Sequence, residues 1–197
     1  MFIQVITGQV ADAAGLEAAL ERWRTDIRPG AVGFLGSTGG ITADGRFVTL
    51  ARFESPEAAQ ANSDRPEQGA WWAEAEKCFS GPVTFQDCTE VDTYRGGGAD
   101  DAGFVQVMQG RADRQQLRAL DQRAEALLPE LRPDLLGSLR AWSGDQFTEV
   151  AYFTSEADAR AAEAQEPPPK VAEALGDWQA AMGEVTYHDL TSPRLIS

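Results

Sequence analysis

The sequence contains the same pattern twice. Phe2–Gly8 (FIQVITG) opens the first half and Phe104–Gly110 (FVQVMQG) opens the second. Near the end of each half stands another matched pair, Gly81–Thr89 and Gly183–Thr191, with the same separation as the first pair. A period of about one hundred residues is the size of a small domain and too long for a solenoid unit. The chain is therefore expected to be a fusion of two similar domains.

The matching continues inside each half, with small gaps of the kind that surface loops tolerate. The aligned positions include Arg28-Pro29 with Arg132-Pro133, Phe47 with Phe147, Phe53 with Phe153, and Ser55 with Ser155. We expect repeats at residues 1–94 and 104–192, joined by a connector at 95–103. Glycines and aspartates dominate this connector, which is typical of a flexible linker.

Hydrophobic spacing assigns the elements of the first repeat. Residues 2–7 alternate as in a strand, and an apolar stripe at helical spacing follows the N-cap residue Asp12. An Asp44-Gly45 turn joins two further strands, and Ser55 starts a second helix. The expected strands are 2–7, 34–42, 47–53 and 83–91, and the expected helices are 13–27, 56–61 and 70–79, with a polar break at 62–69. The second repeat is expected to have strands at 104–109, 136–142, 146–153 and 184–190 and helices at 113–128, 156–165 and 171–182.

The order strand-helix-strand-strand-helix-strand is the ferredoxin-like pattern of the α+β class. Such a unit covers one face of its sheet with helices and leaves the other face bare. The bare faces would carry Ile3, Val5, Val48, Leu50, Val105, Val107 and Val150. Because exposed apolar surfaces of this size promote association, we expect the two sheets to pack face to face within one chain. The expected architecture is an intramolecular pseudo-dimeric α/β barrel.

Charge and cysteine content restrict the function classes. The formal net charge is −14, which argues against binding of nucleic acids or anionic membranes. The N-terminus lacks a signal-peptide pattern and no apolar run has membrane-spanning length, so a cytoplasmic protein is expected. Cys78 and Cys88 are then expected to be buried thiols, with a disulfide as the alternative. The sequence contains no cluster of Cys and His residues with the spacing of zinc ligands, so a metal site is not predicted.

The junctions between third strand and second helix are Leu50–Ser55 (LARFES) and Val150–Ser155 (VAYFTS). With the repeat, they resemble the dimeric α/β-barrel superfamily, and most closely its antibiotic biosynthesis monooxygenase type. This resemblance implies a ligand site between helices and sheet. It also implies either cofactor-independent oxygenation of aromatic, polyketide-like molecules or haem degradation.

Two departures from this family bear on the reaction. Asn62 and Ala162 occupy the place of a His that family enzymes often carry after the junction Ser. Ile6 and Met108 occupy the place of the Asn that haem-degrading members use. Haem oxygenation is therefore not expected, and no cofactor is predicted.

The candidate substrate-binding residues are Gln4, Phe53, Trp72, Gln106 and Phe153. Gln4 and Gln106 occupy matched positions in otherwise apolar strands. An amide there either orients a ligand or binds nearby backbone, because an unpaired buried amide costs about 1–3 kcal/mol.

The candidate catalytic residues are Asn62, Arg65 and Glu149. The segment 62–72 forms either a lid, with Arg65 meeting an anionic group, or a packed surface turn in which one of two adjacent Trp faces the core. Glu149 either serves as a buried general base with a raised pKa or lies near the strand end and reaches solvent. His188, the single histidine, is expected at an edge or near a loop.

Two functional hypotheses follow. The first is a cofactor-independent monooxygenase, or a related enzyme, acting on a small aromatic or polyketide-like molecule. The alternative is a non-catalytic small-molecule-binding or accessory protein of the same fold. The expected partner is a small-molecule ligand, and the protein is expected to be a monomer or a homodimer.

Overall fold

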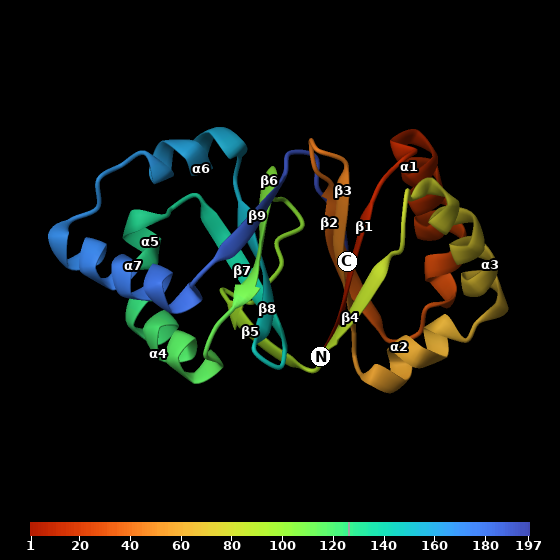
Figure 1. Cartoon of the computed structure of the whole chain (residues 1–197), viewed down its shortest axis with the longest axis horizontal. Coiled ribbons are helices and arrows are strands. Elements are labelled where there is room, and N and C mark those ends of the chain that lie inside the picture. The colour runs from red at the N-terminus through yellow and green to blue at the C-terminus, as the bar shows by residue number, and fades with distance from the viewer. Residues whose placement is uncertain (126) are drawn as a thin grey trace. The chain divides into compact units, whose positions relative to one another are not determined.

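The computed structural model describes residues 1–125 and 127–197. The chain divides into two compact units, and each is described by itself (Figure 1). Unit 1 comprises Met1–Glu90 together with Arg194–Ser197, and unit 2 comprises Val91–Pro193. Two similar α+β units in one chain confirm the fold class that the sequence repeat predicts.

Unit 1 is built on a five-stranded antiparallel sheet with the order β10-β2-β3-β1-β4. Its strands are β1 (Phe2–Gln9), β2 (Phe34–Ile41), β3 (Arg46–Phe53), β4 (Thr84–Cys88) and β10 (Arg194–Ile196). Its helices are α1 (Ala13–Arg22), α2 (Pro56–Ser63) and α3 (Pro66–Ala75), with a π-helical turn at Trp23–Ile27 and 3₁₀ turns at Arg28–Gly30 and Glu76–Cys78. All three helices cover the same face of the sheet (Figure 1).

Unit 2 repeats this plan with the strand order β5-β7-β8-β6-β9. Its strands are β5 (Glu90–Tyr94), β6 (Phe104–Arg111), β7 (Leu135–Ser143), β8 (Gln146–Phe153) and β9 (Val185–Leu190). Its helices are α4 (Arg114–Glu125), α5 (Leu128–Leu131), α6 (Glu156–Glu163) and α7 (Pro169–Met182). The predicted helix 113–128 includes position 126, which lies outside the described residues.

Local chemistry places the starts of α1, α2 and α6 where the sequence predicts them. The Asp12 carboxylate accepts a hydrogen bond from the Gly15 N–H at 2.9 Å and caps α1. Ser55 and Ser155 cap α2 and α6 in the same way. The turn between β2 and β3 needs a left-handed residue, and Gly45 supplies it with φ of +80°.

Three details of the predicted elements are wrong. The polar break at 62–69 is only two residues long, because α3 already begins at Pro66, a residue suited to the first helical position. The predicted strand 83–91 is interrupted at Thr89, and its second part, β5, belongs to the other sheet. The C-terminal tail, for which no element is predicted, forms β10 on the edge of β2.

The strands that end the two repeats are exchanged. β5 is the last strand of the first repeat but lies beside β7 in the sheet of unit 2. β10 follows the second repeat but pairs with β2 in the sheet of unit 1. Each exchanged strand therefore covers an edge that would otherwise present unpaired backbone groups.

Ion pairs of opposite polarity accompany the two exchanged strands. Arg194 of β10 donates to Glu17 of α1 at 2.7 Å, whereas Asp92 of β5 accepts from Arg118 of α4 at 2.8 Å. Glu17 and Arg118 occupy equivalent helix positions, each one residue after a buried leucine. In the sheet of its own repeat, β10 would place Arg194 beside Arg118, and β5 would place Asp92 beside Glu17. Each strand would then meet a side chain of like charge. The charge inversion therefore favours the observed exchange.

Apolar side chains fill the layer between helices and sheet in both units. Clusters lie around Phe47, Phe53 and Trp71 in unit 1, and a cluster that extends from Phe104 to Met182 lies in unit 2. On the sheet face away from the helices, the residues predicted to form the bare surface are buried as well: Ile3, Val5, Val48, Leu50, Val105, Val107 and Val150. Within the described residues, no helix has both the length and the apolar character needed to cross a membrane.

Candidate functional site

Gln4 and Asp87 form a polar pair on the helix side of the unit 1 sheet. They lie opposite each other on β1 and β4, and the Gln4 Nε2 atom donates to the Asp87 Oδ1 atom at 2.9 Å. Gln106 and Asp189 form the same pair in unit 2, also at 2.9 Å. The amides therefore bind neighbouring carboxylates, which rules out a bond to nearby backbone as their only role and leaves the ligand-orienting alternative open. The same side-chain pair therefore occurs at the matched place in both units.

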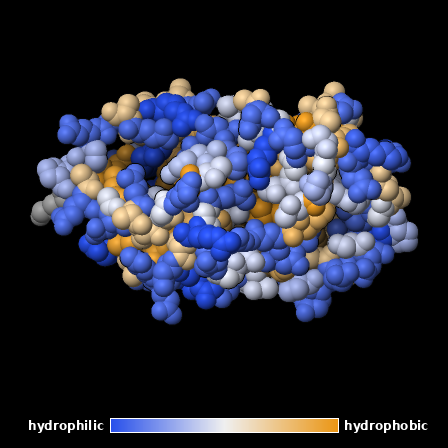
Figure 2. All heavy atoms as spheres, viewed as in Figure 1, coloured by the Kyte–Doolittle hydropathy of each residue, from blue (hydrophilic) through white to orange (hydrophobic). Residues whose placement is uncertain are grey.

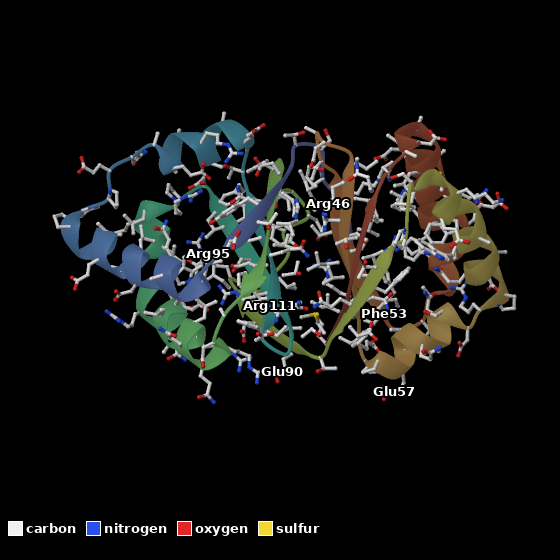
Figure 3. The ribbon with its side chains drawn as sticks, viewed as in Figure 1. Arg46, Phe53, Glu57, Glu90, Arg95 and Arg111 are labelled. Atoms are coloured by element: carbon white, nitrogen blue, oxygen red, sulfur yellow. The ribbon has the colours of Figure 1, made fainter. Side chains whose placement is uncertain are left out.

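An open groove of about 280 Å³ lies beside the Gln4–Asp87 pair, between α2 and strands β1 and β4. Its aromatic and polar lining consists of Phe2, Gln4, Glu57, Gln60, Ser63 and Asp87. Figure 3 labels Glu57 on α2 and Phe53 at the end of β3. Hydrophilic residues predominate on the molecular face shown in Figure 2, in keeping with the net charge of −14.

In unit 2 a side chain occupies the equivalent place. Arg160 of α6 stands where unit 1 has Gln60, and its guanidinium pairs with the Asp189 carboxylate. The same guanidinium pairs with Glu163 at 3.0 Å and lies 5.2 Å from the centre of the Phe104 ring. In unit 1 the Gln60 amide instead donates to Asp64 on its own helix at 2.7 Å. The two units thus share one polar pair, and only in unit 2 does an internal cation cover it.

The two phenylalanines proposed for substrate binding belong to the apolar layer. Phe53 is buried at the end of β3 in a cluster with Phe2 and Ala59. Phe153 is buried at the matching place in unit 2, and the Arg132 guanidinium lies 5.0 Å from its ring centre. Phe53 does not line the groove itself but packs against Phe2, which does.

Asn62 and Arg65 contact each other and do not line the groove. Arg65 Nη1 donates to the buried Asn62 side-chain oxygen at 3.0 Å, and Nη2 donates to the Ile27 carbonyl at 3.1 Å. Glu67 completes the set with an ion pair at 3.0 Å. The guanidinium thus joins the start of α3 to the turn after α1. The structure does not bring these two residues together with Gln4.

Both adjacent tryptophans make core contacts. The Trp71 indole N–H donates to the Ala19 carbonyl at 2.7 Å, which fixes α3 against α1. Trp72 is half-buried and packs edge-on against Phe85, with ring centres 5.1 Å apart. Trp71 is therefore the one that faces the core, as expected, and Trp72 lies partly buried at its rim, where the 3₁₀ turn and β4 bring apolar side chains to it.

Glu149 lies in unit 2 on the sheet face that meets the helices, and it does not reach solvent, with an exposed fraction of 5%. Arg140 on the neighbouring strand pairs with it at 2.7 Å and with Asp121 of α4 at 2.6 Å. The Trp178 indole donates to Asp121 at 2.8 Å. Burial by itself lowers the pKa of Arg140, but Glu149 and Asp121 outweigh it and raise that pKa above its usual range. The arrangement is a buried ionic network around a permanent cation.

His188 lies on β9, an edge strand of the unit 2 sheet, as the sequence predicts. It is buried, and the alternation of the strand turns it to the face opposite Asp189. Cys78 and Cys88 are free and buried, as expected. In the part of the chain that the structure describes, no group of three or more His, Cys, Asp or Glu side chains is arranged to hold a metal ion.

Sequence reasoning missed Asp87, Asp189 and Arg160. The two aspartates are identical residues in matched blocks of the repeat, and Arg160 is the charged replacement of Gln60 at a matched position. Comparison of the repeats for charge differences would have identified Arg160, and the shared aspartate of the matched blocks would have identified the other two.

No protein-family model and no curated protein matches the chain. Among solved structures, it is similar to a "putative monooxygenase" from Lactobacillus acidophilus, with a TM-score of 0.71 at 9% identity over 100% of this chain and 99% of that one. A second "putative monooxygenase", from Fusobacterium nucleatum, gives 0.75 at 7% identity over 99% and 93%. An anthrone oxidase-like protein gives 0.68 at 14% identity over 98% and 92%. Along its whole length, the chain therefore has the fold of these monooxygenase-like proteins, as the resemblance in sequence predicts.

Proposed function

We propose that the protein binds a small molecule in the groove of unit 1, and that unit 2 is a closed scaffold. The observation that carries this proposal is the difference between Gln60 and Arg160 beside two otherwise equivalent Gln–Asp pairs. The Arg160 side chain lies at this place in unit 2, whereas the matched place in unit 1 borders a groove of about 280 Å³.

The chemistry of the groove suits an oriented small ligand. Phe2 supplies an aromatic wall, and the Asp87 carboxylate supplies a charged acceptor. The bond to Asp87 fixes the orientation of the Gln4 amide, which still carries a second N–H and a carbonyl oxygen for a ligand. A few fixed polar groups beside an apolar wall are typical of small-molecule sites.

A ligand panel with matched variants tests the proposal. Neutral, anionic and cationic compounds of up to about fifteen non-hydrogen atoms would be screened by thermal shift, because a ligand that binds only the native state raises Tm. The Gln4→Leu variant is expected to lose the shift produced by the best compound, and the control Gln106→Leu is expected to keep it. Equal loss in both variants, or no shift with any compound, would argue against a site in unit 1.

Cofactor-independent oxygenation of a small aromatic or polyketide-like molecule is the second candidate. The full-length likeness in fold to monooxygenase-like proteins supports it. A second depression of unit 1, of about 250 Å³, adds local support because Arg28 and Phe34 line it. A guanidinium beside an aromatic ring can stabilise the enolate that reacts with oxygen. In such a reaction a methylene loses two hydrogens and gains one oxygen atom as a carbonyl, and the other atom of O₂ leaves as water.

Oxygen consumption tests the second candidate. Anthrone in air would be followed by oxygen electrode and by quinone absorbance, with a protein-free sample to measure spontaneous oxidation. Oxygenation predicts a rate above this background that falls at least tenfold in Arg28→Gln. Arg24→Gln, which changes an exposed arginine paired with Glu21, is the matched control and is expected to keep the rate. A wild-type rate equal to the background would contradict the oxygenase hypothesis for this substrate.

A further inference from the structure

Unit 2 carries a cation at the place that matches the unit 1 groove, where the Arg160 side chain, 40% exposed, pairs with Asp189. Phe104 is the counterpart of Phe2, and the Gln106–Asp189 pair is the counterpart of the Gln4–Asp87 pair, with the same 2.9 Å bond. The group that lies beside the Gln106–Asp189 pair in unit 2 therefore indicates which class of ligand the matched side chains of unit 1 can bind.

The occupant in unit 2 is a guanidinium. Arg160 pairs with the Asp189 carboxylate, and its guanidinium carbon lies 5.2 Å from the centre of the Phe104 ring. A carboxylate on one side and the face of an aromatic ring on another are the two features that stabilise an organic cation. Glu163 adds a second carboxylate at 3.0 Å.

Unit 1 keeps the acceptors of this arrangement and lacks its cation. The Phe2 ring and the Asp87 carboxylate both line the groove, and Glu57 supplies a second carboxylate at its margin. A hydrogen bond from Ser55 lowers the pKa of Glu57, so this group stays ionised at neutral pH. The side chain at the position of Arg160 is Gln60, which is directed to Asp64. None of the residues that line the groove is a lysine or an arginine.

We infer that the ligand of the unit 1 groove is a small organic cation, a guanidinium or primary ammonium compound. Its head group lies between Asp87 and Phe2, where the Arg160 guanidinium lies between Asp189 and Phe104 in unit 2. This inference rests on the proposed function, because it names the class of ligand for the same groove.

Size and long-range charge agree with such a ligand. A space of about 280 Å³ accommodates a guanidinium with a short aliphatic chain. The net charge of −14 raises the local concentration of cations and disfavours anions. Binding is therefore expected to weaken as the salt concentration rises.

Titration calorimetry of the full chain with agmatine, which carries both a guanidinium and an ammonium group, tests the inference. Wild type is expected to bind one equivalent. Asp87→Asn is expected to bind at least tenfold more weakly, whereas the matched change in unit 2, Asp189→Asn, is expected to alter the affinity less than twofold. Binding that is equally strong in Asp87→Asn would overturn the inference.

Gln60→Arg provides the sharpest variant, since it installs in unit 1 the side chain that closes unit 2. It is expected to abolish agmatine binding while the circular dichroism spectrum and the melting temperature stay close to those of wild type. Undiminished binding in this folded variant would contradict the equivalence of the two places.

Parallel titrations with benzyl alcohol and benzoate separate this inference from the proposed function. If either compound binds in a manner that depends on Gln4 while agmatine does not, the cation assignment is wrong and the groove remains a ligand site. If none of the three probes binds, both the assignment and the proposed groove function are contradicted for ligands of this size.

Discussion

Replacing Glu149 by threonine, the residue that unit 1 has at the matched position, is expected to destabilise unit 2 strongly. The carboxylate and the Arg140 guanidinium are both buried, with side-chain exposures of 7% and 5%. Removal of one partner from a buried ion pair costs about 3–5 kcal/mol, because the other charge stays desolvated without its partner.

The magnitude for this site lies at the lower end of that range. Asp121 still pairs with Arg140 at 2.6 Å after the change, but its side chain is 35% exposed and compensates the charge only in part. We therefore expect a loss of about 3 kcal/mol in the free energy of unfolding, which is about a hundredfold in the unfolding equilibrium. For a unit of about one hundred residues, this corresponds to a fall in Tm on the order of 10–20 °C.

Urea unfolding followed by tryptophan fluorescence measures this loss, since Trp142 and Trp178 both lie in unit 2. Asp145→Ala is the matched control in the same unit. It removes an ion pair with Arg111 whose side chains are 65% and 64% exposed, and it is expected to cost less than about 1 kcal/mol. The double variant Arg140→Leu/Glu149→Leu is expected to be more stable than Glu149→Thr, because no unpaired buried charge remains. A cost below about 1 kcal/mol for Glu149→Thr, or a less stable double variant, would refute the reasoning.

Three further predictions concern the thiol, the tail strand and α3. Burial, and to a lesser extent the charge of Asp87, raise the pKa of Cys88 to about 11, so the thiol is protonated at pH 8 and reaction with Ellman's reagent is expected to be slow. The rate is expected to rise steadily toward pH 11, and fast labelling of the native protein at pH 8 would contradict this. Truncation after Pro193 removes β10 and exposes the edge of β2, so a lower Tm and a shift to larger species by gel filtration are expected. An elution profile and Tm unchanged from those of the full chain would count against this role of the tail. Trp71→Phe removes the indole donor to the Ala19 carbonyl, which keeps its intrahelical bond from the Trp23 N–H, and is expected to cost about 0.5–1.5 kcal/mol in urea unfolding, more than Trp72→Phe. The reverse order would be inconsistent with the contacts.

Much of the fold was predictable because it depends on local patterns that occur twice. Alternation along 2–7 and the cap at Asp12 are properties of short segments, and the second copy confirmed each assignment. The exchange of β5 and β10 was not predictable in this way. An apolar alternation shows that residues 83–91 are extended, but it does not show which sheet each part joins.

The site was predictable only where a single residue contrasts with its neighbours. Gln4 is conspicuous as an amide in an apolar strand, and the structure places it in the groove. The partner of Glu149 was not identified, because Arg140 is nine positions away and only the register of β7 against β8 brings the two together. The same limitation applies to Arg65, whose contact with the Ile27 carbonyl depends on how α3 packs.

The central claim is that the place beside the Gln4–Asp87 pair in unit 1 is open to a ligand, whereas Arg160 occupies the place beside the Gln106–Asp189 pair in unit 2. Backbone amide chemical shifts of the full chain, recorded during titration with the tightest ligand of the panel, test it most directly. The account predicts shift changes confined to β1, α2 and β4 around Gln4 and Asp87. Changes centred on Gln106 and Asp189 in unit 2, or spread evenly over both units, would contradict it.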